Sequence, residues 1–210
     1  MIKRFVVSLA IMTFMLVCIS CGPSEISPSE IIEPEVPSNY STYTSEGLFS
    51  ISYPPTWEPA TAVMDELFEY TKEIMESKDP YVELEGVQML FLAGFPTEEG
   101  WWPNVNILIA PRSVDYWALE EIVESESRYS KEYSQEYREF SRVKTAIDAQ
   151  EAMIIDSQEY DPEIGTCRYI QAYIVKGSNV WIITCAVDAE NFEDYEYTFD
   201  SIVRSVRILK

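Results

Sequence analysis

Residues 166–187 read TCRYIQAYIVKGSNVWIITCAV, two apolar runs joined by a short polar segment. Both runs are rich in β-branched and aromatic residues, which are typical of strands. The segment 176–179, Lys-Gly-Ser-Asn, has the composition of a tight hairpin loop. With this loop Val175 faces Val180, and the stretch predicts a hairpin within an antiparallel sheet.

The same register places the two cysteines of the hairpin. Cys167 is expected opposite Asp188, and Cys185 opposite Ile170, so that the two thiols lie on opposite faces of the sheet. A disulfide between them would need a bulge or a change of register. We therefore expect two small apolar core residues, with a disulfide as the alternative if the loop differs.

Other strands are expected on both sides of this hairpin. Polar and apolar residues alternate from Leu48 to Tyr53, and Pro54-Pro55 then ends the run, because proline cannot donate to a sheet ladder. The remaining expected strands are 86–96 and 105–111, joined by the turn EEGWWPN, and a hairpin over 142–160 with its turn at DAQ, 148–150.

Three helices are expected between and after the strands. Residues 64–77 carry apolar side chains at helical spacing. Residues 113–140 are expected to form the longest helix, with Ser113 or Asp115 as N-cap and an apolar stripe made of Trp117, Leu119, Ile122, Val123, Tyr129, Tyr133 and Tyr137. A last helix is expected from about Glu190, followed by a short extended segment, VRIL. This order of elements predicts an α+β fold in which helices sandwich a largely antiparallel β-sheet.

The N-terminus resembles a bacterial lipoprotein signal peptide. Lys3 and Arg4 precede a thirteen-residue, mostly apolar run from Phe5 to Val17, too short for a transmembrane helix of about 20 residues. The following CISC-Gly segment resembles a lipobox, although Cys18 stands where leucine is usual. We expect residues 1–20 to be removed and Cys21 to carry the lipid; an ordinary signal peptide or a retained anchor is the alternative.

Residues 21–43 are rich in Pro, Ser and Glu, without a regular hydrophobic period. Such a segment is typical of a flexible tether. Residues 44–210 are long enough for a single domain with a substantial core.

Charge and composition exclude several functions. Removal of Lys3 and Arg4 leaves 13 of the 15 basic residues against 36 acidic ones, a net charge of −23. Such a chain repels nucleic acid, and we expect no nucleic-acid partner. The sequence has no histidine, which excludes Ser-His-Asp and Cys-His mechanisms, and it has no glycine-rich phosphate-binding motif. We expect no catalytic residues and no cofactor.

Two groups of residues are candidates for binding. Trp101 and Trp102 lie between two expected strands and could form a surface for a partner or a sugar, or else cap the core. The acidic side chains of Asp188, Glu190, Glu193 and Asp194 are weak candidates for a divalent cation site. Because acidic residues are common at a helix start, a solvated helix terminus is the preferred interpretation.

Several motifs together resemble the PsbP/Mog1-like family: FSISYPPTW, VNILIAP, the long helix, DAQEAMI, the aromatic hairpin YIVKGSNVWIITCAV, and the final SIVRSVRIL. The resemblance covers most of residues 44–210. It implies an antiparallel sheet packed between helices and gives no indication of catalysis; this family includes extrinsic proteins of the photosynthetic oxygen-evolving complex, a nuclear-transport factor and many bacterial lipoproteins. No ligand residue of the family can be matched in this sequence.

The sequence thus predicts a non-enzymatic, lipid-anchored extracytoplasmic domain that binds a protein or envelope component. Its location would be the outer face of the cytoplasmic membrane or the periplasm. The alternative is a lipoprotein that binds a solute or a divalent cation.

Overall fold

The computed structural model describes residues 36–78, 84–97, 100–112, 118–162 and 165–209. Residues 1–20, Cys21, most of the expected tether and Trp117 lie outside this part of the chain. No helix among the described residues is long and apolar enough to cross a membrane.

A seven-stranded antiparallel sheet forms the centre of the domain, in the order β3-β4-β5-β9-β8-β7-β6. Its strands are β3 (Glu58–Pro59), β4 (Gln88–Thr97), β5 (Gly100–Pro111), β6 (Gln135–Ile147), β7 (Gln150–Asp161), β8 (Gly165–Lys176) and β9 (Asn179–Asp188). A smaller sheet has the order β1-β2-β10, from β1 (Ser41–Ser45), β2 (Phe49–Tyr53) and β10 (Arg207–Ile208).

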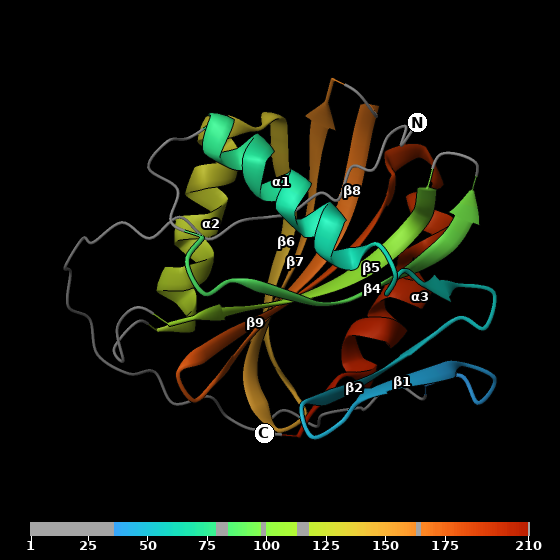
Figure 1. Ribbon diagram of the computed structural model, residues 1–210. Helices are drawn as coiled ribbons and strands as arrows, with labels where there is room; N and C mark the ends of the chain where they lie inside the picture. Colours follow the sequence, from blue (N-terminus) through green and yellow to red (C-terminus); the bar gives the residue numbers. More distant parts are fainter. Residues whose placement is uncertain (1–35, 79–83, 98–99, 113–117, 163–164, 210) are drawn as a thin grey trace.

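Helices cover both faces of the large sheet. Figure 1 shows α1 (Met64–Lys78) and α2 (Leu119–Tyr133) on one side, and α3 (Phe192–Ser205), which follows a short 3-10 turn at Ala189–Asn191, on the other. The core beneath α1 and α2 includes Leu67, Ile122 and Tyr173. The core beneath α3 also takes in β2 and β10 of the small sheet, through Phe49 and Ile208. The α+β class and the sandwich of sheet between helices are confirmed.

The central hairpin has the register that its sequence predicts. Val175 pairs with Val180, Ile170 with Cys185 and Cys167 with Asp188, around a two-residue turn in which Gly177 has a φ of +62°. The turn therefore needs a left-handed conformation that glycine adopts without a steric cost. Cys167 and Cys185 are buried free thiols on opposite faces, so the expectation of two core cysteines is confirmed.

The β6–β7 hairpin also turns where expected, at Asp148 and Ala149, both with positive φ. β6 is an edge strand, and its pairing with β7 is broken by two irregularities, near Glu136 and Phe140. Bulges and charged side chains protect an edge strand against pairing with another chain.

Three expected boundaries are wrong. The helix expected over 113–140 begins at Leu119 and ends at Tyr133, and Tyr137 lies in β6. Pairing of most of β6 with β7 overrides the helical spacing of the tyrosines, because the strand ladder satisfies most backbone groups of residues 135–147, although Tyr137 itself lies at an irregularity. The N-cap of this helix is Ala118, whose backbone N–H donates to the Glu121 carboxylate at 3.1 Å. Ser113 and Asp115, the expected N-caps, lie outside the described residues.

The second correction concerns the turn expected at EEGWWPN, because β5 already begins at Gly100. The strand continues through Pro103 because its pairing with β4 is irregular there, between Asn104 and Trp101. A proline is tolerated at such a position because no regular ladder hydrogen bond is lost. The third correction concerns the tether: β1 begins at Ser41, so strand structure starts before residue 44.

Candidate functional site

Buried polar side chains concentrate on one part of the sheet. Among the described residues, ten polar or charged side chains are buried. Thr71 lies in α1, and Ser201 and Ser205 lie in α3. The other seven lie on the side of the sheet that carries α1 and α2, and we call them the polar patch: Asn104, Asn106, Ser157, Gln171 and Thr184 on strands, with Glu126 and Ser127 on α2.

Strand register brings the sheet residues of the polar patch together. Asn106 of β5 is directly opposite Thr184 of β9, and Thr184 is opposite Gln171 of β8. Their side chains share one face because residues on that face alternate along each strand with core residues of the α3 side. Gln171 donates from Nε2 to Thr184 Oγ1 at 3.3 Å.

Asn106 is the exception in this row. Its side chain is fully buried, and neither Oδ1 nor Nδ2 has a hydrogen-bond partner in the described structure. A buried amide without partners costs free energy comparable to that of desolvating the group, about 1–3 kcal/mol. Such a group is unusual in a native core.

The next row outward is more aromatic. Asn104 pairs with Ala186, and Tyr169 lies opposite both Ala186 and Ser157. Trp102, at the outer end of β5, packs against Cys167, Tyr169 and Ala186 and is partly buried. The polar patch thus runs from the fully buried Asn106 toward a partly exposed indole ring.

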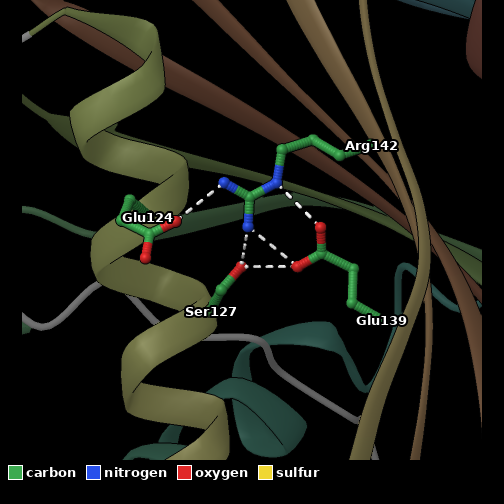
Figure 2. A network of polar contacts seen from close by, with 4 residues as sticks. All are labelled: Glu124, Ser127, Glu139 and Arg142. Atoms are coloured by element: carbon green, nitrogen blue, oxygen red, sulfur yellow. Dashed lines mark hydrogen bonds and ion pairs between the residues drawn. The ribbon is translucent and has the colours of Figure 1, made fainter.

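The charged residues beside the polar patch are bound to one another (Figure 2). Arg142 of β6 donates to Glu139 at 2.8 Å from both Nε and Nη2, to Ser127 Oγ at 2.7 Å and to Glu124 at 2.9 Å. Ser127 in turn donates to Glu139 Oε2 at 3.1 Å. This network fastens α2 to the edge strand.

Burial and hydrogen bonding shift the pKa values of Glu139 and of two neighbouring tyrosines, Tyr137 and Tyr173. The hydrogen bonds from Arg142 outweigh the cost of desolvation and lower the pKa of Glu139. Burial raises the pKa of Tyr137, although hydrogen bonds with Ser127 and Ser157 act in the opposite direction. Burial, and then the nearby Glu126, raise the pKa of Tyr173 well above its usual value. All of these groups keep their ordinary charges at neutral pH.

The binding candidates that the sequence predicts lie in different parts of the fold. Trp102 borders the polar patch, and Trp101 is its neighbour in β5, paired with Pro96. Asp188 ends β9, Glu190 lies in the 3-10 turn, and Glu193 and Asp194 lie in the first turn of α3. No group of three or more Cys, Asp or Glu side chains in the described part of the chain could hold a metal ion. Cys21 is outside that part.

Sequence reasoning missed the polar patch itself. Asn104 and Asn106 stand at alternate positions of an otherwise apolar strand, which is a visible signal in the sequence. Their convergence with Thr184, Gln171 and Ser157 depends on strand order, which the residues of one strand do not reveal.

No protein-family model matches this sequence, and no curated protein matches it. Solved structures do match. Cyanobacterial PsbP from Synechocystis has a TM-score of 0.53 and 10% identity, over 90% of this chain and 97% of that one. A protein of unknown function from Pseudomonas aeruginosa, described as a putative regulator, has a TM-score of 0.46 and 10% identity, over 80% and 96%. LpqN of Mycobacterium tuberculosis, described as involved in cell envelope biogenesis, has a TM-score of 0.48 and 8% identity, over 60% and 80%.

At this low identity the similarity to cyanobacterial PsbP concerns the fold. The antiparallel sheet with α1 and α2 on one face and α3 on the other spans the domain, as the sequence resemblance implied. This chain therefore has the PsbP/Mog1-like fold.

Proposed function

We propose that this chain is a lipid-anchored extracytoplasmic domain that binds a component of the cell envelope, a protein or another molecule, without catalysing a reaction. The observation that carries the proposal is the partly exposed indole ring of Trp102 near the outer end of β5, packed against Cys167, Tyr169 and Ala186. A large aromatic ring that stays partly exposed offers a partner a rigid apolar surface.

The proposed location rests on the N-terminal sequence. Residues 1–20 have the features of a lipoprotein signal, and Cys21 would be the lipid-modified first residue of the mature chain. A Pro-, Ser- and Glu-rich segment follows before β1, which suits a domain held at some distance from a membrane surface.

The charged groups beside the polar patch, Glu139 and Arg142, favour binding over catalysis. A general acid at neutral pH needs a carboxyl whose pKa is raised toward 7. The pKa of Glu139 is lowered instead, because Arg142 holds the carboxylate in its ionised form. Arg142 itself is occupied by three partners, Glu124, Ser127 and Glu139.

The second candidate function is binding of a small solute or a divalent cation. The amides and hydroxyls of Asn106, Gln171 and Thr184 favour a neutral solute over a cation, because hard cations prefer several carboxylate oxygens. Isothermal calorimetry with calcium and manganese tests the cation version, for which we expect no heat of binding.

The location is tested by mass spectrometry of the mature N-terminus in bacterial cells that express the full chain. We expect a diacylglyceryl group on Cys21 and release of the Cys21→Ser variant from membranes. An unmodified chain that begins elsewhere would show that the anchor is wrong.

The binding role is tested by placing a photoreactive phenylalanine analogue at Trp102 of the full chain in intact cells. The matched control carries the analogue at Tyr197, an exposed aromatic residue of α3. We expect a reproducible crosslink to one envelope component from position 102 and none from position 197. Equal or absent crosslinking at both positions contradicts the proposal.

A further inference from the structure

We infer, resting on the proposed function, that the partner is a protein that presents a basic segment, with several arginine or lysine side chains, to the surface around Trp102. We call Trp102, Asp188, Glu159 and Asp161 the Trp102 surface. All four residues are partly exposed, so that a partner reaches them from solvent without entering the core.

Strand register places carboxylates around the point where the indole ring packs. Trp102 packs against Cys167. Cys167 lies opposite Asp188 of β9 on one side and opposite Glu159 of β7 on the other. Because directly opposed residues of an antiparallel pair share a face of the sheet, both carboxylates lie on the face of Trp102. Asp161 follows on the same face, two residues beyond Glu159.

The buried thiol of Cys167 senses these negative charges. Burial is the largest cause that raises the pKa of Cys167 to about 12. The nearby charges of Asp188, Glu159 and Asp161 raise this pKa further. All three carboxylates therefore act on the position against which the indole ring packs, and this end of the sheet face is negative.

The basic side chain at this end of β8, Arg168, lies on the α3 face of the sheet. Its guanidinium binds Asp156 at 2.9 and 2.7 Å and lies over the ring of Phe192 in the core beneath α3. Among the described residues, Asp188 accepts a long hydrogen bond of 3.5 Å from the neutral amide of Asn191 and takes part in no ion pair. The described domain therefore leaves the charge of Asp188 to a partner.

An indole ring beside carboxylates suits a cation. The face of a tryptophan ring attracts an ammonium or guanidinium group, by about 0.5–1 kcal/mol at an exposed site. Carboxylates accept short, charge-assisted hydrogen bonds from the same groups. Arginine combines both contacts, because its planar guanidinium stacks on aromatic rings and donates to carboxylates in pairs. The net charge of −21 adds a long-range attraction for a basic partner.

The spacing of the carboxylates favours a segment over one small ion. β9 and β7 lie on either side of β8, so that two strand spacings, about 9–10 Å, separate the backbones at Asp188 and Glu159. Nor does the described part of the chain contain three Cys, Asp or Glu side chains that could hold one metal ion. Several cationic side chains along one segment can reach both carboxylates and the ring.

The test is isothermal calorimetry on the full chain in a nonionic detergent, with blocked peptides as probes. The first peptide alternates three arginines with glycine. Matched analogues carry lysine, glutamate, or citrulline, which has the shape of arginine without its charge. We expect the arginine peptide to bind at about 0.15 M salt and to bind less tightly as salt is raised. The lysine peptide should bind more weakly, the citrulline peptide about tenfold more weakly or less, and the glutamate peptide not at all.

Variants locate the contact. Trp102→Leu, Asp188→Asn and Glu159→Gln are each expected to weaken binding of the arginine peptide about fivefold or more. The matched control is Glu73→Gln with Glu76→Gln, which removes two exposed carboxylates of α1 and should leave affinity unchanged. Thermal unfolding of each variant shows that it is folded. Asp188→Asn keeps the test valid if Trp102→Leu does not fold, because the Asp188 side chain makes no helix-cap hydrogen bond.

The results separate this inference from the proposed function. Equal binding of the arginine and citrulline peptides, unchanged affinity in the Trp102→Leu and Asp188→Asn variants, or an equal loss in the α1 control would show that the inference is wrong. If the arginine peptide does not bind while the photoreactive probe at position 102 still captures an envelope component, the proposed function stands and its partner is not cationic. If both experiments fail, both proposals are wrong.

Discussion

Asn106 lies at the centre of the polar patch, and its buried amide is expected to lower the stability of the fold. The side chain is fully buried, and its amide has no hydrogen-bond partner in the described structure. Leucine has a similar shape and needs no hydrogen bond, and it would join Leu92 and Leu108 on the same face.

We therefore expect Asn106→Leu to raise the free energy of unfolding by about 1–2 kcal/mol, since it removes an unsatisfied buried amide. Denaturant titration followed by circular dichroism measures this change. Gln171→Leu is the matched comparison: it breaks the hydrogen bond with Thr184 and should lower stability. A loss of stability in Asn106→Leu similar to that in Gln171→Leu would mean that the amide of Asn106 is satisfied in solution.

The two core cysteines give a second prediction for single residues. Burial raises the pKa of Cys167 to about 12 and that of Cys185 well above its usual value. Because only the thiolate is a good nucleophile, neither should react with a thiol reagent in the folded domain at neutral pH. Both should react after unfolding.

The measurement is titration with a chromogenic disulfide reagent, on a chain in which Cys18 and Cys21 are replaced by serine. Rapid reaction of either thiol in the folded state, or no free thiol after unfolding, would contradict the buried positions of Cys167 and Cys185.

Among the elements, α2 depends on its attachment to the edge strand β6. Arg142 joins Glu139 of its own strand to Ser127 and Glu124 of the helix (Figure 2). A second contact joins Lys144 of β6 to Glu120 of α2. The hydrogen bond from Lys144 lowers the pKa of the Glu120 carboxyl. The polar patch lies directly beside this attachment, because Ser127 belongs to both.

We expect Arg142→Met to lower the free energy of unfolding at neutral pH by about 1–3 kcal/mol, because it leaves the partly buried Glu139 without its cation. The effect should depend on pH. The folded-state pKa of Glu139 is lowered below its usual 4.5, so its stabilising contribution is present above that value. The contribution disappears as the pH falls through the lowered folded-state pKa.

The measurement is the difference in stability between the original chain and Arg142→Met across this pH range. The difference should be constant near neutral pH and shrink below the usual carboxyl pKa. Glu139→Gln serves as control, since it should have a flatter acid profile. A difference that does not change with pH would show that Arg142 stabilises α2 by packing alone.

At the scale of the whole molecule, the C-terminal strand connects the two sheets. β10 pairs with β2, Leu209 N–H donates to Leu48 O at 2.7 Å, and the Ile208 N–H donates to the Asp148 carboxylate at 2.8 Å. Lys176 donates to the carbonyl of Ile208. The β6–β7 and β8–β9 hairpins thus hold the end of the chain against the small sheet.

Because Ile208 is buried in the core that α3, β2 and the large sheet share, we expect Ile208→Ala to cost about 2–4 kcal/mol. Leu209→Ala is the matched control: its side chain is 53% exposed and should change stability by less than about 0.5 kcal/mol. Tryptophan fluorescence and circular dichroism should report one common transition. A separate early transition for Ile208→Ala would mean that the small sheet folds independently.

Much of the architecture was predictable from local sequence. The hairpin over 166–187, the position of its turn within 176–179 and the opposite faces of Cys167 and Cys185 follow from alternation and from Gly177, because a strand has a period of two and a tight turn fixes the register. The expected four-residue loop is shorter in the structure, since Lys176 pairs with Asn179. The helix over 64–77 also agrees with α1 within one residue. These features depend on neighbours in the chain, which a single sequence contains.

Tertiary structure decided the rest. Tyr137 has helical spacing with Tyr133 but joins β6, because β7 pairs with that strand on both sides of the irregularity in which Tyr137 lies. The polar patch likewise exists only because strand order places β5, β9, β8 and β7 side by side and lays α2 over them. The sequence by itself determined the composition, the turns of the β6–β7 and β8–β9 hairpins, and the proposed lipoprotein signal at the N-terminus. Which polar side chains meet inside the fold, and that Asn106 lacks a partner among them, depends on contacts between distant segments, and only the folded molecule decides those.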